Sequence, residues 1–134
     1  SVDSVRLLET INREAEKIQR RVKVLLEVHV AKEESKSGFT PEEFLSLNTK
    51  LSTLNYVDVC GIMGMATNTD DEQEIRRCFQ EIAALGKQLL NNAELLNHTE
   101  LAISMGMSDD YLLAVEEGST MVRIGSSIFG ERQY

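Results

Sequence analysis

Residues 57–72 read VDVCGIMGMATNTDDE and contain a change from a buried strand to a long helix. The apolar part, residues 57–65, is typical of a strand that is covered on both faces. A polar loop follows, in which Thr69 and Glu72 have the spacing of a capping box at the start of a helix. We expect this helix to continue to about residue 91. The stretch therefore predicts one complete β/α unit.

The same order of strand and helix occurs along the rest of the chain. Residues 22–30, VKVLLEVHV, alternate β-branched and other side chains and predict a strand. A second capping box, from Thr40 to Glu43 with a proline between them, predicts a helix over residues 41–54. The remaining elements that we expect are a helix over 5–20, strands over 100–105 and 120–124, a short helix over 109–117, and a last turn or short helix over 126–132.

This order predicts an α/β fold with a preceding helix, about four β/α units and parallel strands. A closed (β/α)₈ barrel needs roughly 200 residues or more, and this chain has 134. The fold is therefore either a partial (β/α) barrel or a small open α/β sheet. Because no linker of biased composition divides the sequence, we expect residues 1–134 to form a single domain.

Composition and charge exclude several classes of protein. Hydrophobic residues make up 42% of the chain and charged residues 27%, as in an ordinary globular protein. The 14 basic and 22 acidic residues give a net charge of -8, which argues against nucleic acid as a partner. No apolar run approaches the roughly 20 residues that span a bilayer, and the first residues do not resemble a signal peptide. We expect no membrane partner and a cytoplasmic location.

The two cysteines, Cys60 and Cys78, lie in apolar segments without a CxxC pattern. Buried thiols in a reducing compartment are the expected state, and a disulfide or a metal site is the alternative. No spacing of residues in the sequence indicates a metal site.

Two turns that follow strands carry the most informative polar residues. In β/α proteins the functional loops follow the carboxyl ends of the strands. SMGMSDD places Gly106 and Ser108 in one such turn, and VRIGSS places Gly125 and Ser126 in the next. Glycine N–H groups, serine hydroxyls and a helix start can bind phosphate together. By spacing alone, ordinary turn and cap chemistry is the favoured explanation of the same residues, and phosphate binding is the alternative.

Arg123 lies in an apolar run just before the second of these turns. A buried guanidinium without a partner is costly. We therefore expect Arg123 to contact either a bound ligand or a carboxylate of the chain.

Residues 104–130, SMGMSDDYLLAVEEGSTMVRIGSSIFG, resemble the C-terminal signature of the pyridoxal-phosphate homeostasis protein family. That family consists of single β/α barrels that are similar to the N-terminal barrel of alanine racemase and bind pyridoxal 5'-phosphate (PLP). The resemblance continues upstream through LLEVHVAKEESKSGFTPEEF and CGIMGMATNTDDEQEIRRCF, and SVDS at the start is similar to a strand-to-helix turn of the barrel. It covers the whole chain.

The resemblance implies roles for individual residues. Ser108, Gly125 and Ser126 would hold the cofactor phosphate, and Arg123 would face the pyridine nitrogen. An arginine at that place leaves the nitrogen unprotonated and weakens the ring as an electron sink. The implied function is PLP binding in vitamin B6 homeostasis, as a carrier without catalysis.

The resemblance also implies that this chain corresponds to the C-terminal portion of the family's barrel. The lysine that forms the internal aldimine belongs to the first strand of that barrel, and we find no matching lysine here. Lys36, in SKSG, matches another lysine of the family motif and is a candidate for an adventitious link to PLP. The simpler interpretation of Lys36 is a solvated loop residue.

Two other functions stay open from the sequence. One is a fragment of an amino-acid racemase-like PLP enzyme, which needs a lysine base and a second base that we do not identify. The other is a phosphate-binding or structural α/β fragment without cofactor. In every case an open half-barrel exposes strand edges and apolar surface, which predicts self-association.

Overall fold

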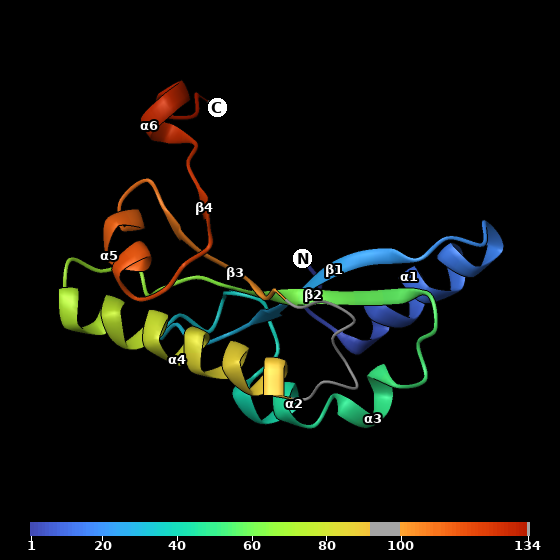
Figure 1. Ribbon diagram of the computed structural model, residues 1–134. Helices are drawn as coiled ribbons and strands as arrows, with labels where there is room; N and C mark the ends of the chain where they lie inside the picture. The colour runs from blue at the N-terminus through green and yellow to red at the C-terminus, as the bar shows by residue number, and fades with distance from the viewer. Residues whose placement is uncertain (92–99, 134) are drawn as a thin grey trace.

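A computed structural model describes residues 1–91 and 100–133 of the chain (Figure 1). Helices and strands alternate after an initial helix, as the sequence predicts. The elements are α1 (Val5–Lys17), β1 (Val22–Val28), α2 (Pro41–Leu45), α3 (Asn48–Leu51), β2 (Val57–Gly64), α4 (Glu72–Asn91), β3 (Ala102–Met107), α5 (Tyr111–Glu116), β4 (Met121–Arg123) and α6 (Ser126–Phe129).

The four strands form one parallel sheet in the order β1-β2-β3-β4. Each strand lies beside the next one in the sequence, and helical segments connect them. A doubly wound sheet reverses its strand order at a switch point, whereas this sheet does not. The arrangement confirms an α/β fold with parallel β/α units and corresponds to a sector of a β/α barrel.

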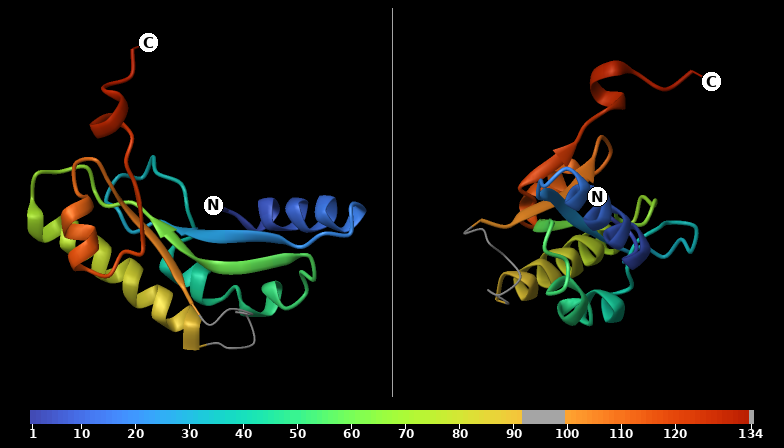
Figure 2. Two further views of the ribbon diagram at one scale, coloured as in Figure 1. Left: turned by 45° about the horizontal axis from the view of Figure 1, so that its top comes forward. Right: turned by 90° about the vertical axis from the view of Figure 1, so that its right-hand side faces the viewer.

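The helices cover mainly one side of the sheet. Figures 1 and 2 show α2, α3 and α4 packed beneath β1 and β2, whereas the opposite side of these strands carries no helix. The core lies between the two layers, where Leu26 and Ile62 from the strands and Phe79 and Ile82 from α4 are fully buried.

The first residues of the chain extend the sheet beyond β1. Val2 forms a parallel bridge with Leu26. Its N–H donates to the Leu25 carbonyl at 2.8 Å, and its carbonyl accepts from the Glu27 N–H at 2.8 Å. The chain therefore passes from a bridge beside β1 directly into α1, in agreement with the strand-to-helix turn that the resemblance implies.

Gly61 allows β2 and β3 to approach closely. The register between β1 and β2 skips Cys60, so β2 contains a bulge at this point. A Cβ atom on residue 61 would lie 1.9 Å from the Ala102 carbonyl oxygen. Only glycine fits here.

The helix predicted over residues 41–54 is wrong in its length. The capping box is present, because Thr40 Oγ1 accepts from the Glu43 N–H at 3.1 Å and Glu43 Oε1 accepts from the Thr40 N–H at 3.0 Å. The Ser46 hydroxyl then donates to the Glu43 carbonyl at 2.8 Å, a local bond that competes with helix continuation. The segment divides there into α2 and α3.

The second predicted capping box does not form. Asp71, rather than Thr69, caps α4, because Asp71 Oδ1 accepts from the Gln73 N–H at 3.1 Å. Thr69 Oγ1 instead accepts from the Asp71 N–H at 3.2 Å and holds the turn that precedes the helix.

The third strand begins and ends two residues later than predicted. Gly106 therefore lies inside β3 and not in the turn that follows it. Its φ is +99°, and a Cβ atom there would lie 2.6 Å from the Ala114 Cβ. Glycine at this position lets α5 pack directly on the end of β3.

Cys78 is completely buried, as predicted, whereas Cys60 is only half-buried; both are thiols. Within the described residues, no helix has the length and apolar character needed to cross a membrane.

Candidate functional site

A cleft of about 730 Å³ opens at the carboxyl ends of β2, β3 and β4. Its lining includes Lys36 from the loop after β1, Met65 after β2, Gly106 and Asp110 around the end of β3, and Arg123 at the end of β4. The volume lies within the roughly 300–1,000 Å³ that is usual for ligand sites. The cleft is therefore at the place where β/α proteins carry their functional groups.

Arg123 extends from β4 across β3 to β2. Its Nη1 donates to Ser104 Oγ at 2.7 Å, and its Nη2 donates to the Gly64 carbonyl oxygen at 3.2 Å. Two neutral oxygens thus hold the guanidinium. Of the two expected partners, a carboxylate is not found: among the described residues no acidic group lies within ion-pair distance of Arg123.

The charged guanidinium of Arg123 is partly buried. Burial lowers its pKa, and the more distant Asp110 and Glu27 carboxylates act in the opposite direction. A guanidinium carries more N–H donors than its two contacts use, and Arg123 lines the cleft. The site can therefore offer a positive donor to an acceptor atom of a ligand.

The structure brings two of the predicted turns together. Ser108 Oγ, in the turn after β3, accepts from the Ser127 N–H at 3.2 Å in the first turn of α6. Gly125 is the N-cap of α6, and its carbonyl accepts from the N–H groups of Ile128 and Phe129. Ser126 is exposed at the start of the same helix. Ser108, Gly125 and Ser126 do not belong to the described lining of the cleft, whereas Arg123 does.

Lys36 is not the solvated loop residue of the simpler interpretation. Its Nζ lies 2.6 Å from Glu33 Oε2 and donates to the Ala66 carbonyl at 2.9 Å. Only 23% of its side chain is exposed. The hydrogen bond from Lys36 lowers the pKa of Glu33, and the Asn68 N–H, which also binds this carboxylate, acts in the same direction. The loop after β1 is thus fastened to the loop after β2.

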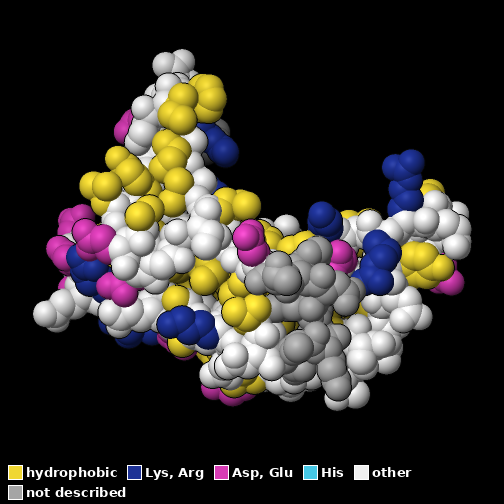
Figure 3. Space-filling view, viewed as in Figure 1, with side chains coloured by type: hydrophobic (Ala, Val, Ile, Leu, Met, Phe, Trp, Pro, Cys, Tyr) yellow, Lys and Arg dark blue, Asp and Glu magenta, His cyan; other side chains and the backbone are white. Residues whose placement is uncertain are grey.

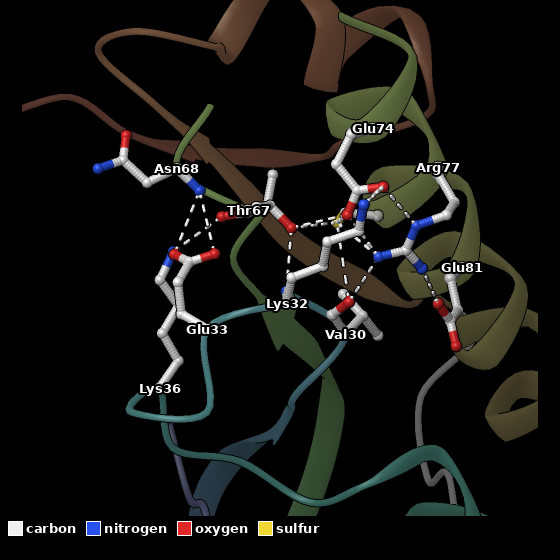
Figure 4. Close-up of polar contacts among 11 residues, drawn as sticks. Val30, Lys32, Glu33, Lys36, Thr67, Asn68, Glu74, Arg77 and Glu81 are labelled. Atoms are coloured by element: carbon white, nitrogen blue, oxygen red, sulfur yellow. Dashed lines mark hydrogen bonds and ion pairs between the residues drawn. The ribbon is translucent and has the colours of Figure 1, made fainter. Parts of the chain in front are cut away.

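A second set of contacts fastens the same loops to α4 (Figure 4). Thr67 Oγ1 accepts from the Lys32 N–H at 3.0 Å and donates to Glu74 Oε1 at 2.8 Å. Arg77 Nη2 donates to the Val30 carbonyl at 2.9 Å and to Glu74 Oε1 at 2.8 Å. Hydrogen bonds from Arg77 and then from Thr67 hold the pKa of Glu74 at about 2. These bonds make the loops after β1 and β2 a fixed wall of the cleft.

Sequence reasoning missed Ser104, the residue that holds Arg123. Ser104 is the one hydroxyl in the run AISMG, which is otherwise apolar. Its exposed fraction is 2%. A polar side chain in an otherwise apolar strand needs a partner, and that signal was available. Within residues 1–91 and 100–133 no group of three or more histidine, cysteine or acidic side chains could hold a metal ion.

Comparison with known proteins gives a family match along almost the whole chain. The family model described as alanine racemase, N-terminal domain, matches residues 1–133. The pyridoxal phosphate homeostasis protein of Haemophilus influenzae is 35% identical over 134 residues, which are 100% of this chain and 56% of that protein. The protein of the same name from Helicobacter pylori is 39% identical over 132 residues, 98% of this chain and 56% of that protein. This chain therefore spans a little more than half of the length of these relatives.

Solved structures agree with this match. PipY of Synechococcus elongatus, in a structure without PLP, has a TM-score of 0.86 and 34% identity, and the match covers 97% of this chain and 60% of PipY. A structure of PipY with PLP bound has a TM-score of 0.81 and 34% identity, with 97% and 59% of the two chains covered.

Proposed function

This chain belongs to the alanine racemase N-terminal domain family, and from that membership we propose that it binds PLP at the cleft and serves in holding and delivering the cofactor. The relatives named for pyridoxal phosphate homeostasis and the PLP-bound structure of PipY support this proposal. When bound, PLP supplies an aldehyde that reacts with amines. The residues of this chain would provide binding, orientation and charge.

The observation that carries the proposal is the environment of Arg123. Its guanidinium lines the cleft, is held by the Ser104 hydroxyl and the Gly64 carbonyl, and has no described acidic partner within ion-pair distance. A partly buried positive charge of this kind is stabilised when an acceptor atom reaches it. The pyridine nitrogen of PLP is such an acceptor, and a donor that stays charged would leave that nitrogen without a proton.

The proposed phosphate site consists of Ser108, Gly125 and Ser126 and lies beside the cleft, because Met107 and Asp109, the chain neighbours of Ser108, both line it. The contact between Ser108 Oγ and the Ser127 N–H supports it, because it joins the two turns that carry these residues. A phosphate would replace this weak 3.2 Å bond with stronger bonds to a charged group. An inorganic phosphate ion would satisfy the same donors, so it is the competing ligand.

Calorimetric titration of the chain with PLP tests the proposal. We expect binding of one PLP per chain, weakened at least about tenfold by Ser108→Ala and by Arg123→Ala, since each removes a hydrogen bond to a charged group. Ser52→Ala serves as a control, because its hydroxyl only donates to the Thr49 carbonyl at 2.7 Å, in α3. Absence of PLP binding by the unaltered chain would contradict the function. Equal affinities for all four proteins would contradict the assignment of residues.

We also infer that residues 1–134 act as one domain that self-associates, in the cytoplasm. One continuous core from Val2 to Ala114 supports the single domain. Figure 3 shows hydrophobic side chains gathered over α5, β4 and α6. The large apolar side chains exposed in this region are Met107, Tyr111, Leu112, Val115, Met121, Val122, Ile128 and Phe129. Contiguous apolar surface of this kind favours association.

Sedimentation velocity tests the self-association. We expect a species larger than a monomer, and a shift towards the monomer in Phe129→Ser, which removes the most exposed of these side chains at 84%. A single monomeric species over the whole concentration range would overturn this part of the proposal.

A further inference from the structure

Ser104 is the least exposed polar residue at the cleft end of the sheet. Its exposed fraction is 2%, and it lies on β3 between β2 and β4. It is paired in register with Met63 on one side and with Met121 on the other. Ser104 is thus buried within the sheet, between two neighbouring strands. A hydroxyl in such a place is costly unless it has a hydrogen-bond partner.

The partner is Arg123, and the contact has the geometry of a strong hydrogen bond. The distance from Nη1 to Oγ is 2.7 Å, shorter than the 3.2 Å from Nη2 to the Gly64 carbonyl. The two acceptors lie on different strands, β3 and β2, so together they fix both the position and the plane of the guanidinium. Without Ser104, only the longer bond would remain and the group could rotate about it.

We propose that Ser104 is a positioning residue that sets the direction in which Arg123 presents its remaining N–H groups to a ligand in the cleft. The inference about ligand choice rests on the proposed PLP site, whereas the fixing of Arg123 does not. Ser104 itself would touch no ligand. It would determine whether the cleft distinguishes a ring that carries an acceptor nitrogen from a ring of the same shape without one.

The fixing of Arg123 can be measured without any ligand. Nitrogen-detected NMR of arginine side chains reports rotation about the Nε–Cζ bond, which exchanges the Nη1 and Nη2 positions. We expect separate, slowly exchanging Nη signals for Arg123 in the unaltered chain and in Ser104→Thr, which keeps the hydroxyl. In Ser104→Ala these signals should merge. Unchanged signals in Ser104→Ala would overturn the proposal.

Ser119→Ala is the matched control. Ser119 also carries a hydroxyl between β3 and β4, but it donates to the Met105 carbonyl at 2.7 Å and to the Met121 carbonyl at 3.0 Å. This variant loses a hydroxyl in the same region without touching Arg123. The Arg123 signals should stay separate in it, and their merging there would mean that general loosening of the strands, not Ser104, controls the guanidinium.

Ligand choice is tested with two phosphorylated probes that lack the aldehyde. One is deoxypyridoxine phosphate, and the other is its analogue with carbon in place of the ring nitrogen. The preference is the ratio of the affinities for the pyridine probe and the carbon analogue. We expect it to fall about tenfold in Ser104→Ala, which is the effect of one hydrogen bond to a charged group. It should persist in Ser104→Thr and Ser119→Ala. An undiminished preference in Ser104→Ala would overturn the role in ligand choice. If neither probe bound the unaltered chain, the proposed function would fail, and the NMR measurement would still decide whether Ser104 holds Arg123.

Discussion

Glu74 and Arg77 are joined by two parallel hydrogen bonds on α4, from Nε to Oε2 at 2.9 Å and from Nη2 to Oε1 at 2.8 Å. This bidentate geometry is the strongest arrangement between a guanidinium and a carboxylate. Because Arg77 also binds the Val30 carbonyl, the pair connects α4 to the loop after β1. Through Val30 and Thr67 the pair fastens the loops after β1 and β2, which carry Lys36 and Met65 of the cleft lining.

The first prediction concerns acid stability. The hydrogen bonds of Arg77 lower the pKa of Glu74 from an ordinary value of 4.5 to about 2. The Glu74 carboxyl group therefore binds a proton less tightly in the folded state than in the unfolded state. The stabilisation is complete above about pH 4.5 and is lost as the pH falls towards 2. We expect Glu74→Gln to lower the Tm at neutral pH and to flatten the fall of the Tm between these two pH values, as measured by circular dichroism.

The control for this experiment is Glu81→Gln. Glu81 also contacts Arg77, at 2.9 Å, but its side chain is 36% exposed. We expect a smaller loss of Tm and an acid-induced fall that keeps its normal slope. An equally flattened profile in both variants would mean that the acid response does not come from Glu74.

The second prediction concerns the close approach of β2 and β3 at Gly61. Gly61→Ala would place a methyl group 1.9 Å from the Ala102 carbonyl oxygen, so the strands must separate. We expect a loss of about 3 kcal/mol in the free energy of unfolding, the upper end for an inserted methyl group. Gly118→Ala is the comparison, because a Cβ atom there meets nothing within 4 Å and only the φ of +102° opposes it. Its cost should be nearer about 1 kcal/mol. Urea denaturation measures the free energy of unfolding of both variants. Equal losses in Gly61→Ala and Gly118→Ala would contradict the steric explanation.

The strand and helix order was predictable because each signal in it is local. The apolar run of residues 57–65 and the capping box at Thr40 depend on neighbours in the sequence. The errors arose where two local signals compete. Ser46 ends α2 through a bond to its own turn, and Asp71 caps α4 although Thr69 has the better spacing. Gly106 was read as a turn residue, whereas the structure uses its missing Cβ for packing against Ala114.

The candidate site was predictable only in part, because its contacts join distant parts of the chain. Arg123 was recognised as needing a partner, but Ser104 and Gly64 approach it only through the parallel pairing of three strands. Lys36 looked like a solvated residue because nothing in its loop shows that the Ala66 carbonyl lies 2.9 Å away. Local sequence indicates which groups are costly to bury, and the sheet determines which of them meet.

The third prediction separates folding from association on the apolar surface of α5 and α6. Leu112 and Phe129 are 65% and 84% exposed. Leu112→Ser and Phe129→Ser should each change the free energy of unfolding by less than about 0.5 kcal/mol, as exposed positions do. Phe79→Ala, at a site with 0% exposure, should cost about 3–5 kcal/mol. Urea denaturation gives these values. A large loss in either serine variant, measured at a concentration where the unaltered chain is monomeric, would mean that its side chain belongs to the folded core.

The fourth prediction compares two ion pairs of the same spacing. Lys17 pairs with Glu14 on α1 at 3.0 Å, with side chains 64% and 56% exposed. Lys36 pairs with Glu33 at the cleft at 2.6 Å, with side chains 23% and 30% exposed. In each pair a hydrogen bond from the lysine lowers the pKa of the glutamate.

Carbon-detected NMR titration distinguishes the two pairs. Lys17→Met should raise the pKa of Glu14 alone, and Lys36→Met that of Glu33 alone. Salt screens exposed charges far more than partly buried ones. At about 1 M salt, where the screening length is about 3 Å, the pKa of Glu14 should return towards its ordinary value while that of Glu33 stays lowered. An equal response of both glutamates to salt would mean that the loop after β1 is as open to solvent as α1, and the fixed wall of the cleft would have to be abandoned.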